Sequence, residues 1–236
     1  MFPSSHSVPT LTSFLMNFRR NVLGLCQGRP TTPSHLEIDL SWASLHSCLR
    51  GLYDESLESY FDRSWRIANY EAKGNDLYKG IVHFCTSHLM NTVGRKLSRM
   101  NIGKHIKEFV LRGMGVLVNC TKLSRLLELS SALVVCLTAK KEGRSLNEDK
   151  TLLLAAIDRI SPAELDALCA QNEKQSQFDD ASLEMEETLS VKIRDIPPFS
   201  RALKRKSAAK LAKLDEKPEQ PVNLLNCTKV VEYLQT

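Results

Sequence analysis

The 236-residue sequence lacks the features that mark several large classes of protein. No apolar run approaches the roughly 20 residues that a membrane-spanning helix needs, so we expect no membrane partner. The seven cysteines are scattered without a C-x-x-C pair, which favours reduced thiols over a disulfide framework. The polar start at Met1 does not resemble a signal peptide. We therefore expect a protein that is not secreted and that lies in the nucleus or the cytoplasm.

Catalytic fingerprints are missing as well. The sequence contains no Walker motif, no dinucleotide-binding glycine pattern and no Ser/His/Asp set, so nothing predicts a small-molecule cofactor. Its composition, with 42% hydrophobic and 25% charged residues, is that of an ordinary folded protein. The net charge of +5 permits contact with nucleic acid without demanding it.

Two short apolar runs, each followed by a helical pattern, predict an α/β unit. Leu36, Ile38 and Leu40 alternate with acidic residues, which is typical of a half-buried strand, and a helix from Trp42 to Gly51 follows. Residues 80–85 form a second β-type run before another helical pattern. We expect the two runs to be neighbouring parallel strands, with functional groups near the strand ends.

Asp39, Cys85 and His88 lie where the two predicted strands end and are the candidate site residues. Asp39 or Ser41 can also cap the next helix, so a structural interpretation of Asp39 stands beside a functional one. Cys85 and His88 form a C-x-x-H pair, but a structural zinc site takes four ligands, commonly as two spaced pairs, and no second pair is present. We therefore predict a structural role for Cys85 and His88 and no metal site.

An Asp late in a strand with Ser-Trp after it, then a C-x-x-H where a later strand turns into a helix, resembles the Mutator-like (MULE) superfamily of DDE transposases. The resemblance covers roughly residues 1–120. It implies an RNase H-like catalytic domain in which two Asp and one Glu bind divalent metal and cut and join DNA. The family's C-x-x-H lies between the second Asp and the final Glu, so Asp39 corresponds to the second acidic residue.

The resemblance also indicates what is missing. Residues 1–38 contain no Asp, and Glu232 lacks the Asn-rich surroundings of the family's third carboxylate. One carboxylate cannot hold two Mg²⁺ ions for in-line phosphoryl transfer. We therefore expect an internal fragment or domesticated derivative of a transposase, catalytically inactive and without a cofactor, whereas an intact relative requires Mg²⁺. Binding to DNA or to a protein partner would remain. The alternative is a helical protein–protein interaction module unrelated to transposition.

Two basic stretches are candidate nucleic-acid contacts or localisation signals. The first is either a solvated helix end or a phosphate-binding patch, and comprises Arg95, Lys96, Arg99, Lys104 and Lys107. The second places six positive charges between Arg201 and Lys213. It is either a disordered tail or a nuclear-localisation or nucleic-acid patch, with Lys204, Arg205 and Lys206 as the predicted localisation signal.

The predicted fold class is α/β but mainly helical. It comprises a partial RNase H-like core of two parallel strands with flanking helices, an all-helical insertion block and a disordered basic tail. The expected segments are a disordered start (1–9), the core (10–120), the helical block (121–170), a charged linker with the basic cluster (171–222) and a short C-terminal helix (223–236). An amphipathic helix from Thr10 is expected to cover the sheet. A helix over residues 56–70 is expected to turn Leu57, Tyr60 or Phe61, and Trp65 inward. A capping box from Ser161 to Glu164 predicts a helix over 165–170.

Overall fold

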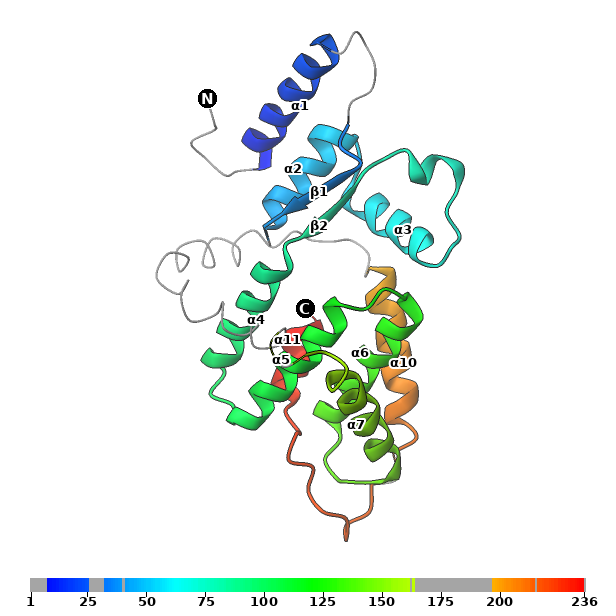
Figure 1. Cartoon of the computed structure of the whole chain (residues 1–236). Coiled ribbons are helices and arrows are strands. Elements are labelled where there is room, and N and C mark those ends of the chain that lie inside the picture. The colour runs from blue at the N-terminus through cyan, green and yellow to red at the C-terminus, as the bar shows by residue number, and fades with distance from the viewer. Residues whose placement is uncertain are drawn as a thin grey trace. The chain divides into compact units, whose positions relative to one another are not determined.

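The computed structural model describes residues 8–25, 32–39, 41–161, 163, 197–214 and 216–235. Across them the chain is a mainly helical α/β protein with two parallel strands, as the sequence predicted (Figure 1). It divides into two compact units, the first of Met1–Leu89 and Ser176–Pro198 and the second of Met90–Gln175 and Phe199–Thr236. The boundary falls within the helix α4 (Thr86–Arg99), inside the segment predicted as the core.

The sheet of the first unit has the predicted connectivity. β1 (His35–Ile38) pairs in parallel with β2 (Ile81–Phe84). Parallel neighbours need a crossover connection, and here it consists of α2 (Trp42–Tyr53), α3 (Leu57–Ala68) and the short 3-10 helix η1 (Gly74–Leu77). The prediction of two neighbouring parallel strands is therefore confirmed.

Serine side chains begin both crossover helices. Ser41 Oγ accepts a hydrogen bond from Ser44 N at 3.3 Å, and Ser56 Oγ accepts one from Ser59 N at 3.2 Å. Each bond satisfies one of the backbone N–H groups that a helix leaves unpaired in its first turn. Of the two residues predicted as the cap of α2, the structure uses Ser41 and not Asp39.

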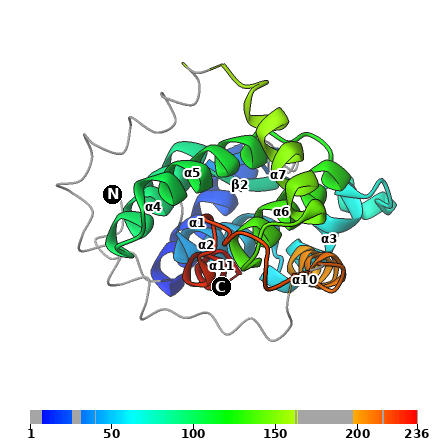
Figure 2. The same ribbon diagram turned by 90° about the horizontal axis from the view of Figure 1, so that it is seen from below.

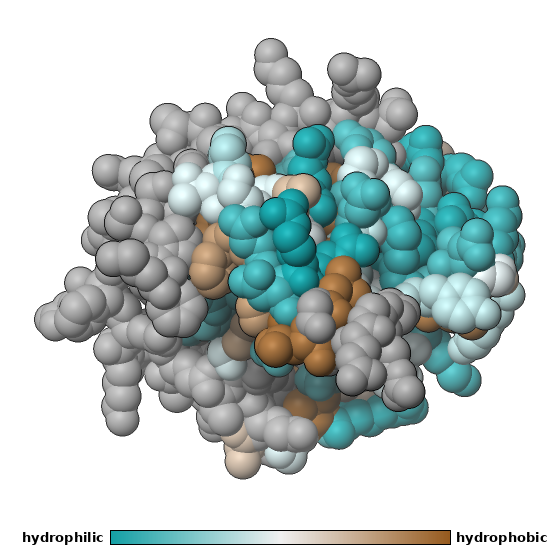
Figure 3. Space-filling model, turned by 90° about the horizontal axis from the view of Figure 1, so that it is seen from above, coloured by the Kyte–Doolittle hydropathy of each residue, from teal (hydrophilic) through white to brown (hydrophobic). Residues whose placement is uncertain are grey.

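The N-terminal helix, α1 (Val8–Leu25), packs mainly on α2 instead of covering the sheet as predicted. It begins two residues before the expected Thr10, so residues 8–9 are helical, and residues 1–7 lie outside the described part of the chain. Met16 and Phe18 on its outer side are each about half exposed. The view of Figure 3 shows a face on which hydrophobic side chains lie among hydrophilic ones.

Gly51 allows the close approach of α1 to α2. A Cβ atom at Gly51 would lie 2.6 Å from Leu15 Cβ of α1, which is shorter than any normal contact between two carbon atoms. The prediction that Gly51 ends its helix is wrong. α2 continues to Tyr53, and Asp54, with a φ of 50°, ends it in the left-handed conformation.

The core of the first unit lies between the sheet and its helices. Leu45, Leu49 and Leu52 of α2 are buried together with Tyr60 of α3 and Val82 of β2. Complete burial of a large apolar side chain contributes about 1.5–3 kcal/mol to stability. Tyr60 also donates its hydroxyl to the backbone oxygen of Val82, which ties α3 to β2.

The described part of the second unit consists mainly of helices, seen from below in Figure 2. Besides the C-terminal part of α4, they are α5 (Lys104–Val118), α6 (Leu123–Thr138), α7 (Arg144–Ile157), α10 (Pro198–Leu211) and α11 (Thr228–Gln235). Every residue of α6 from 129 to 137 is buried, and α5, α7 and α11 pack against this helix. The helix expected over 165–170 lies outside the described residues, as do Pro162 and Glu164 of the capping box before it.

The basic segment near the C-terminus is a helix, α10, and the prediction of a disordered tail is wrong there. Ser207 of α10 is only 3% exposed, and Lys210 forms an ion pair with Asp149 of α7. This pair joins positions 61 residues apart in the sequence. Local composition could not reveal the helix, because the contacts that order it come from distant residues. Residues 171–196 of the predicted linker lie outside the described part of the chain.

The last predicted linker stretch is also held in place. Glu142 N donates to Pro221 O at 2.8 Å, and Lys141 forms an antiparallel bridge with Val222. Asn223, which follows, is only 2% exposed and donates through Nδ2 to backbone oxygens at the end of α6. The segment before α11 is therefore part of the packed second unit.

Helix length and hydropathy bear on the expected lack of a membrane partner. Among the described residues, no helix is both long enough and apolar enough to cross a lipid bilayer.

Candidate functional site

The ends of β1 and β2 bring the three candidate site residues together. Asp39 directly follows β1, Cys85 directly follows β2, and His88 lies in the first turn of α4. Cys85 N donates to Ile38 O at 2.8 Å, so the strand pairing extends to Cys85. His88 Nδ1 lies 3.4 Å from Asp39 Oδ1. Two residues that are 49 positions apart in the sequence are thus direct neighbours.

The contact between Asp39 and His88 contributes little energy, although the two side chains lie close together. The Asp39 side chain is 75% exposed and that of His88 is 38% exposed, so water competes for both groups. Such an exposed pair contributes about 0–1 kcal/mol, and only when the imidazole is protonated. His88 Nδ1 itself is shielded from water and makes no hydrogen bond of good geometry. The contact therefore places the two side chains next to each other and leaves the Asp39 carboxylate mostly in solvent.

A cleft of about 600 Å³ lies beside these residues in the first unit. Asp39 and Cys85 line it together with Cys48 of α2 and with Leu11, Phe14 and Leu15 of α1. Burial raises the pKa of the Cys48 thiol to about 11, so this thiol stays protonated at neutral pH. A protonated thiol is neither a nucleophile nor a ready metal ligand. The lining thus offers apolar surface and exposed carboxylates but no activated thiol at Cys48.

The described residues contain no group of three or more His, Cys, Asp or Glu side chains suited to hold a metal ion. Asp39 and His88 supply two ligands between them. Mg²⁺ prefers six oxygen ligands in an octahedral arrangement, and two-metal catalysis needs several carboxylates around one site. The part of the chain that the structure describes does not assemble the two-metal arrangement that the resemblance implies for an intact relative.

Four of the five basic residues predicted to contact phosphate surround the turn between α4 and α5. We call these four the basic turn: Lys96, Arg99, Lys104 and Lys107. Lys107 Nζ donates to Ser98 Oγ at 2.6 Å, and Lys104 Nζ lies 3.8 Å from Glu108 Oε1. Arg95, the fifth predicted residue, is half-buried one turn earlier. The structure therefore gathers the predicted charges at one turn, with Arg99 and Lys104 the most exposed.

A buried arginine that the sequence analysis missed organises the loop before β2. Arg63 of α3 is 2% exposed, and its Nε and Nη2 donate to the two carboxylate oxygens of Glu55 at 3.0 and 2.9 Å. The remaining donors reach the backbone oxygens of Asp76, Lys79 and Gly80 at 2.9 to 3.2 Å. The sequence analysis predicted that the Trp65 side chain faces the core. The buried face of α3 instead carries Arg63, because paired hydrogen bonds make its burial tolerable.

The loop over residues 69–79, which we call the pinned loop, is held by this network and by a second arginine. Arg66 binds both carboxylate oxygens of Asp76 at 2.7 and 2.9 Å, and Lys73 N donates to the same carboxylate at 2.9 Å. These donors hold the pKa of Asp76 well below its usual range. The same loop leaves Tyr70 90% exposed and Tyr78 83% exposed. A fixed backbone thus presents large side chains to solvent.

The predicted localisation signal lies within α10. Lys204 and Arg205 are exposed and Lys206 is half-buried. Consecutive residues of a helix point about 100° apart, so the three charges lie around the helix and do not form one row. Whether they act as a localisation signal stays a prediction.

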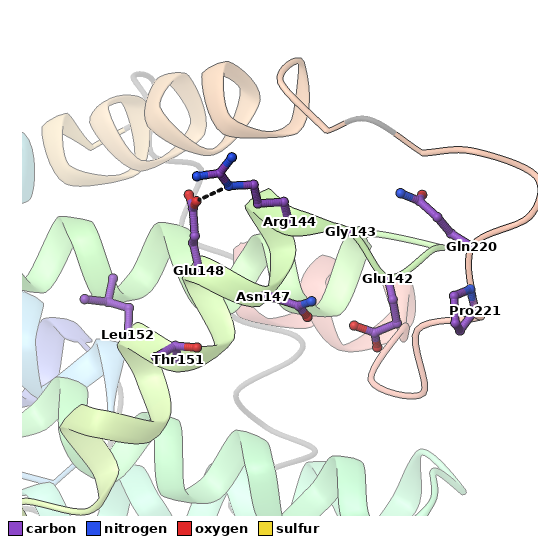
Figure 4. A pocket seen from close by; sticks show the side chains of 9 residues that line it. All are labelled: Glu142, Gly143, Arg144, Asn147, Glu148, Thr151, Leu152, Gln220 and Pro221. Carbon is purple, nitrogen blue, oxygen red and sulfur yellow. Dashed lines mark ion pairs between the residues drawn. The ribbon is translucent and has the colours of Figure 1, made fainter.

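A second hollow, of about 970 Å³, lies along the first turns of α7 (Figure 4). Gln220 and Pro221 line its other side. Arg144 Nε lies 3.4 Å from Glu148 Oε1, the pair marked by the dashed line, and Glu142 is paired with Lys150. None of the residues predicted as sites from the sequence lies in this hollow, and we assign it no chemistry.

Comparison of the chain with protein-family models, with curated proteins and with solved structures gives no match. The resemblance to Mutator-like transposases therefore rests on the residues around Asp39, Cys85 and His88.

Proposed function

We propose that the protein derives from a Mutator-like DDE transposase and binds nucleic acid without cutting it. The proposal rests on the position of Asp39 and His88 at the carboxyl ends of two neighbouring parallel strands. There His88 Nδ1 lies 3.4 Å from Asp39 Oδ1. Ligands and catalytic groups of open α/β sheets gather at this end of the strands. An acidic residue and a C-x-x-H at adjacent strand ends are what the resemblance implies for a partial RNase H-like core.

The proposed loss of cleavage follows from the carboxylates. In-line phosphoryl transfer with two metal ions needs several carboxylates around one point. Asp39 has one imidazole beside it, and the described residues contain no group of three or more His, Cys, Asp or Glu side chains that could hold a metal ion. Binding then depends on the basic turn, whose positive charges are suited to phosphate groups.

The test uses the purified full chain, a labelled DNA duplex and a salt series. Replacing Arg99 and Lys104 by alanine should weaken binding and reduce the slope of log affinity against log salt by about 2, since each lost phosphate contact removes about 0.9. A matched control replaces Arg112 and Lys122, two exposed cations elsewhere in the second unit, and should change the slope by less than about 1. If the two double variants change the slope by the same amount, the basic turn is not the surface that binds nucleic acid.

Plasmid nicking tests the other half of the proposal. With Mg²⁺ or Mn²⁺ the wild-type chain should give no nicking above background, and Asp39→Asn should behave in the same way. Metal-dependent nicking that Asp39→Asn abolishes would show that further acidic ligands complete the site.

The location that fits this function is the nucleus, and Lys204, Arg205 and Lys206 are the candidate signal. Imaging of a fluorescent fusion of the full chain checks this location, and exclusion of the fusion from the nucleus contradicts it.

The second candidate function is a protein–protein interaction module, and the pinned loop favours it. Leu77 is 71% exposed beside Tyr78, on a backbone that the Arg63 and Arg66 networks hold in place. Exposed large side chains on a rigid support bind partners with little loss of conformational entropy. Tyrosine is also enriched among the residues that dominate binding energies at interfaces.

The corresponding experiment compares proteins retained from a nuclease-treated extract by the wild-type chain and by a Leu77→Ser/Tyr78→Ser variant. We expect at least one direct partner whose affinity falls about tenfold or more in the variant, since anchor residues contribute 2 kcal/mol or more. Leu154→Ser, at a half-exposed position of the second unit, is the control. A set of partners that the loop variant retains unchanged rules the pinned loop out as an interaction surface.

A further inference from the structure

The exposed side of α10 carries positive charge without any negative charge. Arg201, Lys204 and Arg205 are exposed and follow the i, i+3, i+4 spacing that places side chains on one side of a helix. We call these three residues the basic stripe. α10 contains no Asp or Glu, so no acidic residue of the same helix neutralises them. The other exposed positions of the helix are the small residues Ala208 and Ala209.

The opposite side of α10 is anchored to the second unit. Ser207 is almost completely buried, and the ion pair between Lys210 and Asp149 joins α10 to α7. Downstream of the helix, Lys140 N donates to Glu216 Oε1 at 2.8 Å. The basic stripe is therefore displayed by a helix that is already formed, and a ligand does not have to bear the entropic cost of ordering a tail.

The composition of the exposed side distinguishes between ligands. A lipid surface is bound by cations next to large apolar side chains, and the exposed positions of α10 have only alanine beside the cations. Single-stranded nucleic acid is bound largely by stacking of bases on aromatic side chains, and none of the exposed positions of α10 is aromatic. A duplex offers regularly spaced phosphates to a row of cations, and small neighbouring residues allow the backbone to come close.

We infer that the basic stripe is a phosphate-binding surface for the backbone of double-stranded nucleic acid, separate from the basic turn. The inference relies on the proposed function for the class of ligand, and it names a second surface that the proposal does not include. Because the contacts are to phosphate, the binding is independent of base sequence and weakens with salt.

The experiment measures duplex binding by the full chain through fluorescence anisotropy across a salt series. The test variant is Arg201→Ala/Lys204→Ala/Arg205→Ala, in which alanine maintains helix propensity. The control is Arg112→Ala/Lys122→Ala/Lys229→Ala, which removes the same charge from exposed positions of the second unit outside α10. We expect the slope of log affinity against log salt to fall by about 2–3 in the test variant and by less than about 1 in the control.

The outcomes separate this inference from the proposed function. If the slope of log affinity against log salt falls in the α10 variant but not in Arg99→Ala/Lys104→Ala, the basic stripe binds the duplex and the basic turn does not. If the slope falls only in Arg99→Ala/Lys104→Ala, the inference is wrong and the proposed function stands. Equal slopes for the α10 variant and its control also overturn it, as does a wild-type chain that does not bind duplex at low salt. If the α10 variant loses binding to polyglutamate and keeps binding to duplex, the ligand is an acidic polypeptide and the inference is wrong.

Discussion

Replacing Arg63 by alanine is expected to lower the free energy of unfolding of the first unit by about 3–5 kcal/mol, the usual cost of breaking a buried ion pair from one side. The change would leave the Glu55 carboxylate buried without its partner, at a site where both side chains are at most 3% exposed. It would also leave the backbone oxygens of Asp76, Lys79 and Gly80 without their donor. The loop before β2 would lose its support.

Tryptophan fluorescence during urea unfolding measures this effect selectively, because both tryptophans, Trp42 and Trp65, lie in the first unit. Arg63→Lys should be nearly as harmful as alanine, since one ammonium group cannot replace a planar fork that binds a carboxylate through two nitrogens. Arg66→Ala is the control. Its pair with Asp76 is 30% exposed on the arginine side, so water can replace the lost donors. An Arg63 variant as stable as the Arg66 variant would show that the buried network does not support the fold.

Replacing Asn223 by alanine is expected to destabilise the second unit by about 2–4 kcal/mol, because a buried polar group left without a partner costs about 1–3 kcal/mol. Asn223 Nδ2 donates to Cys136 O and Ala139 O, both at 2.8 Å. These are among the carbonyl groups that a helix leaves unpaired in its last turn, here the last turn of α6. The asparagine thus acts as a C-terminal cap supplied from 84 to 87 residues away.

The isosteric variant Asn223→Asp gives the sharper test. An ionised carboxylate has the shape of the amide but cannot donate, and it would place a negative charge against two carbonyl oxygens. It should therefore be at least as destabilising as alanine in thermal unfolding followed by circular dichroism. Asn226→Ala is the matched control, since Asn226 makes similar bonds to Thr138 O and Ala139 O but is only half-buried. An aspartate variant with wild-type stability would show that these bonds do not hold the segment.

The sequence predicted which residues form the candidate site but not how they are arranged in space. The strand-end positions of Asp39 and Cys85 follow from alternation and from the turn into a helical pattern, which are local properties. The distance between Asp39 and His88 depends on the register of two strands joined by a 42-residue connection (residues 39–80), and register is a tertiary property. The cleft beside them also depends on how α1 packs against α2, which Gly51 permits.

By itself the sequence determined both strands, most of the helical segments from α2 to α6 and two candidates for the cap of α2, because periodicity and capping act within a few residues. It also determined the parallel pairing of the two strands, because the helical pattern between them predicts a crossover connection. Only the tertiary structure decided that Arg63 is buried, that Asn223 caps a distant helix and that the basic segment forms α10. The physical reason is the same in each case: a buried or ordered polar group is stable only with its partners, and here some or all of those partners lie far away in the chain.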